Sequence, residues 1–380
     1  MSIFLWIGII LLITYVFIIG IYSYYWNKLS SWKVSKSYLP ITKVTVIIPA
    51  RNESENIFAC LDSILKQNYP SELLEIIVID DFSDDDTAQI VRSFKDQRVK
   101  LIQLENEAIE IKNSYKKKAI EIAIAKSNGD FILTTDADCI VPEQWLKLIV
   151  SFYQKNQYKF IAAPVVFYEE SNILEKFQSL DFIGMMGISG AGVEGRFMNM
   201  CNGANLGYEK DAFNEVDGFS GIDHLASGDD MLLMQKMAKK YPNGVGYLKN
   251  KNVAVKTKAK STLISFYKQR IRWASKSSAY PEKRITLILG IVFLFSLYLL
   301  IGFPIFLFIY PQSVGIFFLL FFSKMIVDFY FLRKMSLFFD KQNLLTSFLP
   351  SFLLHLLYII VIGTMSQIKK DYEWKGRKTV

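Results

Sequence analysis

The sequence predicts a soluble α/β domain with a mainly parallel sheet, carried between membrane-spanning helices. Two observations predict this fold class. The middle of the chain alternates β-branched runs with helical patterns, as strand–helix–strand units do. Long uncharged runs flank this region, and a bilayer core needs about 20 consecutive apolar residues. With 51% hydrophobic residues overall, the composition agrees with a membrane protein better than with a wholly soluble one.

The first apolar run covers residues 3–22 and precedes the first charge, Lys28. No basic residue comes before it and no small-x-small cleavage site follows, so we expect a retained helix over residues 1–27 rather than a cleaved signal peptide. Aromatic residues at 24–26 suit a membrane surface, and the lysines beyond them favour the cytosolic side. We therefore expect residues 42–260 to form a cytosolic domain.

Three more apolar runs lie in a predicted membrane region, residues 283–366, at 285–309, 314–331 and 344–362. This makes four spans in a multi-pass protein of the cell (inner or plasma) membrane. Three crossings after a cytosolic domain would leave the tail, residues 367–380, outside, yet its lysines and arginine favour the cytosol. One apolar segment is then re-entrant or interfacial, and the sequence leaves this choice open.

Two further predictions concern a pair of charged residues inside an apolar run and a glycine-rich segment. Lys324 and Asp328 lie four residues apart within one apolar run, which predicts a mutual ion pair on one helix. The glycines from Gly184 to Gly195 predict a mobile loop near an acceptor rather than a phosphate cradle.

Strands and helices alternate along the predicted domain. The expected strands are residues 44–48, 76–79, 99–104 and 131–135, and the expected helices are 55–66, 87–94 and 116–127. In open α/β sheets, ligands bind outside the carboxyl ends of the strands. Polar clusters follow three of these strands, so we expect them to meet in one crevice.

Asp136 and Asp138 follow the buried strand at 131–135. Two carboxylates at that spacing can face one hard cation, and Mg²⁺ or Mn²⁺ prefers such oxygen ligands. A D-x-D pattern alone also occurs as an ordinary loop cap. Its position after a buried strand therefore carries the prediction of a metal site.

A second acidic pair, Asp80 and Asp81, ends the strand at 76–79. A carboxylate at this tip can accept hydrogen bonds from a nucleoside base or ribose, and the sequence does not choose between the two. The acidic residues 84–86 are better explained as a turn and as the cap of the following helix.

A third pair, Asp229 and Asp230, precedes an apolar helical pattern, where an N-cap role would explain Asp229. Further along, Gln269, Arg272 and Trp273 are spaced to share one helix face. That face offers an amide, an aromatic ring and a guanidinium, which suits phosphate.

The segment that carries this face, residues 261–282, also has the pattern of an amphipathic helix lying on the bilayer. The side chains expected toward lipid are Leu263, Ile264, Phe266 and Tyr267. Both interpretations of the segment can hold together.

Five motifs in sequence order resemble glycosyltransferase family 2, and more closely its membrane-bound branch with cellulose, chitin and hyaluronan synthases and ceramide glucosyltransferases. The motifs are Pro49-Ala50-Arg51-Asn52-Glu53, Asp80-Asp81, Asp136-x-Asp138, Gly228-Asp229-Asp230 and Gln269-x-x-Arg272-Trp273. The resemblance covers roughly residues 44–273. It implies a GT-A fold and an inverting transfer from a nucleotide sugar, most often a UDP-sugar, with Mg²⁺ or Mn²⁺ as cofactor.

The resemblance also implies site roles. Residues around the nucleotide would be Pro49, Arg51, Glu53, Asp80, Asp81, Lys116 and Asp136. Asp138, with Asp136, would bind the metal, and Asp230 would be the general base. Gln269, Arg272 and Trp273 would close over the diphosphate.

Three details qualify these roles. Lys117 and Lys118 compete with Lys116 for the lysine near the donor. The loop 202–205 resembles the family's loop beside the sugar, although a tight turn explains it nearly as well. Asp229 stands where many processive synthases carry a glutamate, which weakens membership of that subgroup.

The acceptor is expected to be a lipid or lipid-linked glycan at the cytosolic face, in the synthesis of cell-envelope glycans or glycolipids. Few spans favour single transfer over a processive polysaccharide synthase. A transporter or scaffold with an inactive nucleotide-binding domain is the alternative from another class, and the complete carboxylate set argues against it.

Composition adds two exclusions. The net charge of +8 suits anionic membrane lipids, and since no nucleic-acid motif accompanies it, we expect no nucleic-acid partner. The cysteines Cys60, Cys139 and Cys201 fit neither a zinc spacing nor a disulfide framework, so free thiols are expected.

Overall fold

The computed structural model describes residues 3–107, 114–197, 200–225, 228–275, 282–368, 372–375 and 377–379. The chain divides into two compact units. The globular unit consists of Leu29–Tyr168, Asn199–Lys258 and Glu373–Val380, and the helical unit consists of Met1–Lys28, Glu169–Met198 and Ala259–Tyr372.

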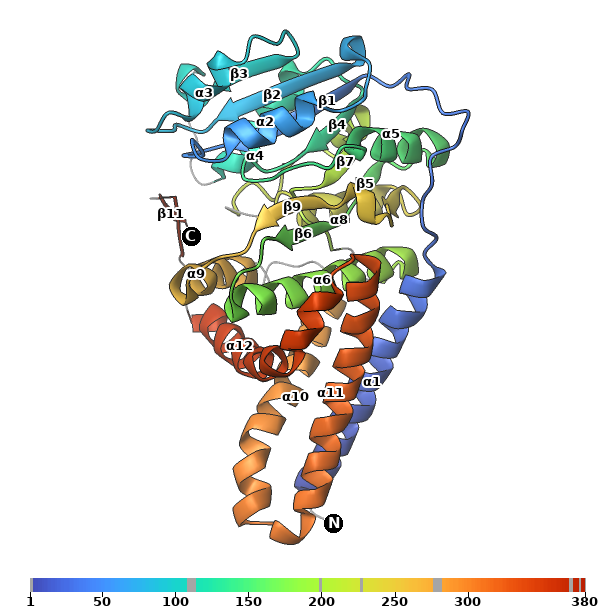
Figure 1. Ribbon diagram of the computed structural model, residues 1–380, viewed down its shortest axis with the longest axis vertical. Coiled ribbons are helices and arrows are strands. Elements are labelled where there is room, and N and C mark those ends of the chain that lie inside the picture. The colour runs from blue at the N-terminus through green and yellow to red at the C-terminus, as the bar shows by residue number, and fades with distance from the viewer. Residues whose placement is uncertain are drawn as a thin grey trace. The chain divides into compact units, whose positions relative to one another are not determined.

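A mixed seven-stranded sheet forms the centre of the globular unit, with the strand order β3-β2-β1-β4-β7-β5-β8 (Figure 1). The strands are β1 Val44–Ala50, β2 Leu74–Asp80, β3 Val99–Gln103, β4 Phe131–Thr134, β5 Phe160–Ala162, β7 Leu206–Glu209 and β8 Val245–Tyr247. The first four are parallel, as predicted, because each is reached through a crossover helix. Only β7 runs antiparallel to its neighbours. A small sheet pairs β6 Val165–Tyr168 with β9 Val255–Lys258.

Three helices of the globular unit lie near the predicted ranges: α2 Ile57–Leu65, α3 Thr87–Ser93 and α4 Tyr115–Lys126. Helix α8 Met231–Lys240 follows the apolar pattern after Asp230, and α5 Trp145–Asn156 and α7 Lys210–Glu215 are additional helices that the sequence analysis does not predict. In α2 the buried side chains are Ile57, Cys60, Leu61 and Ile64. They share one buried face because they recur at helical spacing. The resulting fold is the GT-A-like α/β arrangement that the sequence predicts.

Strand β1 is longer than predicted, since it continues through Pro49 to Ala50. Pairing of β1 with β4 ends at Ile47, whereas pairing with β2 extends to the last residue. The carbonyl oxygen of Ile47 accepts a hydrogen bond from Thr135, so Pro49, two residues later, faces the same side of β1, beyond the end of the β4 pairing. The missing N–H of Pro49 therefore costs no ladder hydrogen bond.

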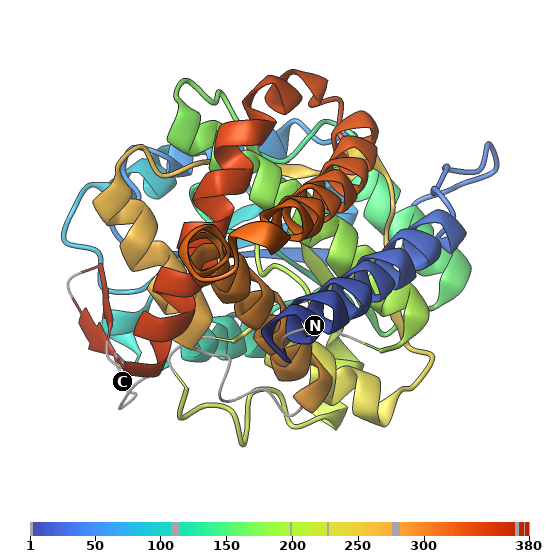
Figure 2. The same cartoon turned by 90° about the horizontal axis from the view of Figure 1, so that it is seen from below.

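The helical unit contains α1 Ile3–Lys28, α6 Ile173–Gly195, α9 Leu263–Ala274, α10 Lys283–Phe308, α11 Val314–Phe338 and α12 Phe348–Ile368. Among the described residues, four helical segments are long and apolar enough to cross a membrane: Ile3–Lys28, Lys283–Phe308, Pro311–Phe338 and Gln342–Ile368. Helices α1 and α10 pack side by side (Figures 1 and 2). Large apolar side chains such as Phe17 and Leu319 remain exposed on the unit, as lipid-facing positions require.

The predicted mobile loop at Gly184–Gly195 is wrong, because these residues form the end of the 23-residue helix α6. The glycines serve close packing instead. A Cβ atom on Gly187 would lie 2.2 Å from Sδ of Met335 in α11. Small residues at such a contact let two helices approach closely.

The predicted ion pair inside the apolar run is confirmed. Nζ of Lys324 lies 2.7 Å from Oδ2 of Asp328, and the Lys324 side chain is fully buried. The hydroxyl of Tyr15 donates a hydrogen bond to the same carboxylate. Charge and hydrogen bonding are thus satisfied within the helical unit at this position.

Candidate active site

Acidic side chains collect where the parallel strands of the globular unit end. Asp80 is the last residue of β2, and Asp136 and Asp138 come shortly after β4. Asp229 and Asp230 immediately precede helix α8. This arrangement follows from the topology, since parallel strands present their carboxyl ends at one edge of a sheet.

Lys116, from the first turn of α4, lies among three of these carboxylates. Its Nζ is 2.8 Å from Oδ1 of Asp136 and 3.0 Å from Oδ2 of Asp229. Burial would lower the pKa of Lys116, but Asp136, Asp229 and Asp230 raise the pKa well above its ordinary value. The lysine therefore stays charged and partly neutralises a surplus of negative charge.

The structure distinguishes the three consecutive lysines by their partners. Lys117 is buried and donates hydrogen bonds to the carbonyl oxygens of Ile222 at 2.7 Å and Leu225 at 2.5 Å. Lys118 lies 3.4 Å from Glu121 on its own helix. Of the three, Lys116 is the one that contacts the acidic cluster.

Asp230, not Asp229, caps helix α8. Oδ1 of Asp230 accepts a hydrogen bond from the backbone N–H of Met231 at 2.7 Å. Its other oxygen accepts one from Gly203 at 3.2 Å. The prediction that Asp229 serves as the cap is wrong because the Asp229 carboxylate is paired with Lys116 instead.

The loop 202–205 contributes one residue to the cluster and one to the core. A Cβ atom on Gly203 would lie 3.3 Å from Oδ2 of Asp229, so the backbone can approach the carboxylates there because no side chain intervenes. Asn205 is buried, and its amide donates hydrogen bonds to the carbonyl oxygens of Pro164 and Val253 at 2.7 and 2.9 Å. The tight turn and the contact with the site are both present.

Asp136, Asp138 and Cys139 form a group whose potential ligand atoms all lie within 4.8 Å of one another. The two carboxylates fit a hard divalent cation such as Mg²⁺ or Mn²⁺. A cysteine sulfur is a softer donor, which suits other metals better than these ions. The predicted pair of carboxylates is therefore the candidate donor set for a hard cation.

The two aspartates at the tip of β2 have different partners. Asp80 accepts hydrogen bonds from the backbone of Ser83 at 3.3 Å and from Gln103 at 3.5 Å. Both oxygens of Asp81 accept from the Arg377 guanidinium at 2.8 Å. Burial raises the pKa of Asp81 although this guanidinium opposes the shift. Asp80 thus stabilises its own loop through hydrogen bonds, and Asp81 forms an ion pair with the planar guanidinium of Arg377.

Arg51 and Glu53 support the loops around Asp81. The Arg51 guanidinium donates to the carbonyl oxygens of Asp81 and Phe82 at 2.7 and 2.6 Å. Glu53 accepts from the amide of Asn56 at 2.8 Å. Both residues therefore shape this end of the site through protein contacts, and Pro49 does so as a half-buried member of β1.

The acidic turn after β2 precedes helix α3, as predicted, but its N-cap residue, Asp86, makes no side-chain cap hydrogen bond, and Asp85 holds the start of the helix instead. Its carboxylate accepts hydrogen bonds from the backbone of Thr87 and Ser54, each at 3.0 Å. Burial would raise the pKa of Asp85, but hydrogen bonds from Thr87 and Ser54 lower it to about 2. Asp85 thereby ties the start of α3 to the loop after β1.

Gln269, Arg272 and Trp273 lie on α9 in the helical unit. The Trp273 ring stacks on Phe182 with centroids 5.9 Å apart. Arg272 is half-buried, and among the described residues its guanidinium has no ion-pair partner. The predicted amphipathic face is partly wrong, because Leu263 is exposed whereas Phe266 is buried within the unit.

Sequence reasoning missed Arg270, the neighbouring arginine on α9. Its side chain is 1% exposed and lies 3.0 Å from Oδ2 of Asp181. The guanidinium carbon is 4.5 Å from the centre of the Trp273 ring. Arg270 therefore contacts Trp273, and no local signal in the sequence distinguishes it from Arg272, since both are arginines on the same helix.

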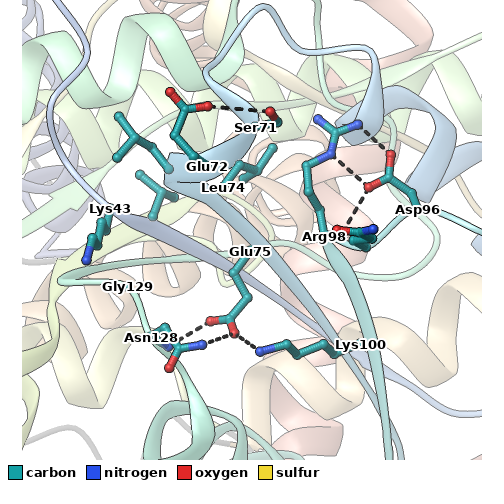
Figure 3. Close-up of a pocket in the computed structure, with 13 residues that line it drawn as sticks. Lys43, Ser71, Glu72, Leu74, Glu75, Asp96, Arg98, Lys100, Asn128 and Gly129 are labelled. Atoms are coloured by element: carbon teal, nitrogen blue, oxygen red, sulfur yellow. Dashed lines mark hydrogen bonds and ion pairs between the residues drawn. The ribbon is translucent and has the colours of Figure 1, made fainter.

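A surface hollow of the globular unit, about 780 Å³, lies away from this cluster (Figure 3). Its walls include Val44, Leu74 and Glu75, which begin β1 and β2. Glu75 is occupied by Lys100 and Asn128, at 2.6 and 2.9 Å. The hollow is at the amino ends of the strands and its central charge is already paired, so the acidic cluster is the better candidate site.

Residues 45–217 match the family model described as "Glycosyl transferase family 2". The glycosyltransferase AglE of Haloferax volcanii is 31% identical over 50% of this chain and 59% of its own length. The poly-beta-1,6-N-acetyl-D-glucosamine synthase of Staphylococcus epidermidis is 23% identical over 63% of this chain and 56% of its own length. The chain thus spans just over half the length of these two relatives.

Two further similarities extend the comparison. The UDP-Glc:alpha-D-GlcNAc-diphosphoundecaprenol beta-1,3-glucosyltransferase WfaP of Escherichia coli is 34% identical over 34% of this chain and 45% of its own length. The mannosyltransferase PcManGT of Pyrobaculum calidifontis, solved with GDP-Man and Mn²⁺, covers 92% of this chain and 99% of its own, with 17% identity and a TM-score of 0.59. The last similarity concerns the fold alone.

Proposed function

Because residues 45–217 match the family model for glycosyl transferase family 2, we propose that the protein transfers a sugar from a nucleotide sugar to a lipid or lipid-linked acceptor. The observation that carries the proposal is the cluster of Lys116 with Asp136, Asp229 and Asp230 at the strand ends. Among the described residues this cluster joins three carboxylates to one lysine, an arrangement that favours a divalent metal and its diphosphate ligand.

The nucleotide would bind beside the tips of β1 and β2. Asp81 is the proposed nucleoside contact, because Asp80 holds the backbone of its own loop, whereas the partner of Asp81 is the side chain of Arg377. Arg51, Glu53 and Pro49 would shape this subsite, and Lys116 would lie near the diphosphate. We propose a UDP-sugar as donor, following the resemblance to the membrane-bound branch.

Asp138 and Asp136 would hold Mg²⁺ or Mn²⁺, since two carboxylates are the donors such ions prefer. When bound, the metal acts as a Lewis acid toward the leaving diphosphate, a contribution of several kcal/mol. Arg272 would add a fixed positive charge there, and Gln269 and Trp273 would line the same region. Asp138 is the principal metal ligand in this proposal, following the family resemblance.

Asp230 would act as the general base. A hydroxyl is a poor nucleophile until its proton is removed, and a positioned carboxylate contributes roughly 10²–10⁴-fold. The backbone of Gly203 and Met231 fixes the orientation of the Asp230 carboxylate. A single displacement with one base inverts the anomeric centre, and no second nucleophilic carboxylate is required.

A membrane-bound acceptor is supported by the four apolar helical segments and by the E. coli relative, whose name specifies a diphosphoundecaprenol acceptor. We place the globular unit in the cytosol at the cell membrane. The S. epidermidis relative is a polymer synthase, so a processive reaction is the second candidate. Retention of every carboxylate in the motifs argues against an inactive scaffold or transporter.

The test is nucleoside diphosphate release by the full chain in isolated membranes, with native lipid extract as acceptor. A panel of UDP- and GDP-sugars would be supplied with Mg²⁺ or Mn²⁺. We expect release from one donor, loss with chelator, and a decrease of roughly 10²–10⁴-fold in Asp230→Asn. Asp211→Asn, an exposed aspartate of the globular unit, is the matched control and should behave as wild type.

The product separates the two acceptor classes. A radiolabelled sugar that partitions into organic solvent identifies a lipid-linked product, whereas a water-soluble polymer of increasing length identifies a processive synthase. Equal release by wild type and Asp230→Asn, with every donor, would contradict transferase activity at this site.

A further inference from the structure

The end of the chain reaches the nucleoside end of the proposed donor site. Residues Glu373–Val380 belong to the globular unit and include β11, Arg377–Thr379, which pairs with β10, Tyr372–Trp374 (Figure 1). We infer that this hairpin is an internal inhibitor: it occupies the nucleoside subsite and must leave before the donor binds. The inference rests on the proposed function.

Arg377 fills the space around Asp81. Its Nη1 atom is 2.8 Å from both carboxylate oxygens of Asp81. The guanidinium carbon lies 3.7 Å from the centre of the Tyr115 ring and 5.5 Å from that of Phe82. Only 18% of the Arg377 side chain and 4% of the Asp81 side chain are exposed. The guanidinium is therefore enclosed between two rings and a carboxylate.

These contacts are the ones a nucleobase would need. A base is planar, presents N–H donors at its edge, and gains stability when its face lies on an aromatic ring. The guanidinium of Arg377 is also planar, donates N–H bonds to Asp81 and lies on the Tyr115 ring. Both groups cannot occupy this space, so binding of one excludes the other.

Lys375 neutralises a second acidic residue of the subsite. Its ammonium group is paired with the carboxylate of Glu53 and donates to the carbonyl oxygens of Arg51 and, at 3.3 Å, Asn52. In return, Nε of Arg51 donates to the carbonyl oxygen of Lys375 at 3.3 Å. The hairpin thus contacts both loops that bound the subsite, after β1 and after β2.

The small size of the hairpin makes its occupation of the nucleoside subsite reversible. Both strands have only three residues, and an isolated two-stranded hairpin is marginally stable. The tail is tethered, so its effective concentration is high even where each contact is weak. If the hairpin is closed in about nine molecules of ten, the apparent Kd for the nucleotide is about tenfold above its intrinsic value.

The test measures binding of UDP and GDP, each with Mg²⁺, to the purified full chain by calorimetry. We expect Arg377→Ala to bind one of them about three- to tenfold more tightly than wild type. Arg284→Ala is the matched control, because Arg284 is 64% exposed and belongs to the helical unit. An affinity that is unchanged or weaker in Arg377→Ala overturns the inference while leaving the donor site in place. Absence of binding by every variant overturns the proposed donor site and the inference with it.

A second measurement reports the hairpin directly and needs no substitution. Amine labelling of the wild-type chain, followed by mass spectrometry, compares Lys375 with Lys66, which is 73% exposed. Saturating nucleotide should increase labelling of Lys375 and leave Lys66 unchanged. Decreased labelling of Lys375 would mean that the hairpin closes over the nucleotide, and the inhibitor role would be refuted.

Discussion

Two buried lysines show how the units of this protein treat charge differently. Lys116 in the globular unit contacts Asp136 and Asp229, with Asp230 also near enough to raise its pKa. Lys324 in the helical unit contacts a single carboxylate, Asp328, which also accepts a hydrogen bond from Tyr15. Lys116 therefore lies near more than one carboxylate, whereas Lys324 and Asp328 form a matched pair of one cation and one carboxylate.

The difference separates a site from a scaffold contact. A matched pair that is fully enclosed leaves no net charge for a ligand, and such pairs can often be replaced by apolar residues without loss of stability. A cluster with surplus negative charge is incomplete by itself and is stabilised by a further cation. The acidic cluster is therefore the place where a metal would bind, whereas the pair in α11 is not.

The largest effect is expected from breaking the ion pair of Lys324 and Asp328. Lys324→Met leaves Asp328 without its cation in an apolar unit, and we expect a loss of about 3–5 kcal/mol in unfolding free energy. The double variant Lys324→Met/Asp328→Leu should recover most of this loss. Thermal unfolding in detergent measures both. A double variant no more stable than the single one would show that the two side chains do more than neutralise each other.

The next effect concerns the outnumbered lysine. Lys116→Met removes a preorganised charge from the proposed donor site, so we expect transfer to fall by roughly 10²–10³-fold. The double variant at Lys324 and Asp328 is the control and should keep its rate within about threefold. Initial rates of nucleoside diphosphate release decide this. Equal losses in both variants would remove the distinction between the two lysines.

Metal binding sharpens the comparison further. Mn²⁺ at about 100 times its Kd should stabilise the wild-type chain by about 2.7 kcal/mol. We expect Asp138→Asn to lose most of this gain, and the double variant of the matched pair to keep it. The readout is the shift of the unfolding midpoint on addition of Mn²⁺. A full shift in Asp138→Asn would place the ion elsewhere.

The smallest effect concerns a carboxylate stabilised by hydrogen bonds alone. Asp85 has a pKa of about 2 in the folded chain, below its ordinary 3.8. A lowered pKa means that its stabilisation is present above about pH 4 and is lost as the pH falls toward 2. Asp85→Ala should cost about 1 kcal/mol at neutral pH, because the backbone N–H groups of Thr87 and Ser54 lose their side-chain acceptor. Its difference from wild type should shrink in unfolding curves recorded from pH 5 down to pH 2, and a constant difference would refute this account.

Much of the globular unit could be predicted because its signals are local. Strands β1, β2 and β4 appear as buried β-branched runs, and their polar ends follow directly. The choice of Lys116 over Lys117 could not be predicted in this way. Successive helical residues point about 100° apart, and which one meets the carboxylates depends on how α4 packs on the sheet.

Other features could not be predicted because the residues that explain them lie far apart in the sequence. Gly187 suggests a loop by composition, but its neighbour Met335 on another helix is the reason for the glycine. The contact between Arg377 and Asp81 joins residues 296 positions apart. No periodicity or motif links such pairs, so the sequence of the basic tail predicts only which side of the membrane its charge favours.

The contact of Arg377 with Asp81 also fixes how often the chain can cross a bilayer. The chain leaves the globular unit after Lys258 and returns to it at Glu373. An excursion that begins and ends in one compartment crosses the membrane an even number of times. Three apolar helices, α10 to α12, lie on this excursion, so we expect that one of them does not complete a crossing, in line with the re-entrant or interfacial segment that the sequence suggests. With two complete crossings, the basic tail and the carboxylates share one compartment, as the distribution of positive charge requires.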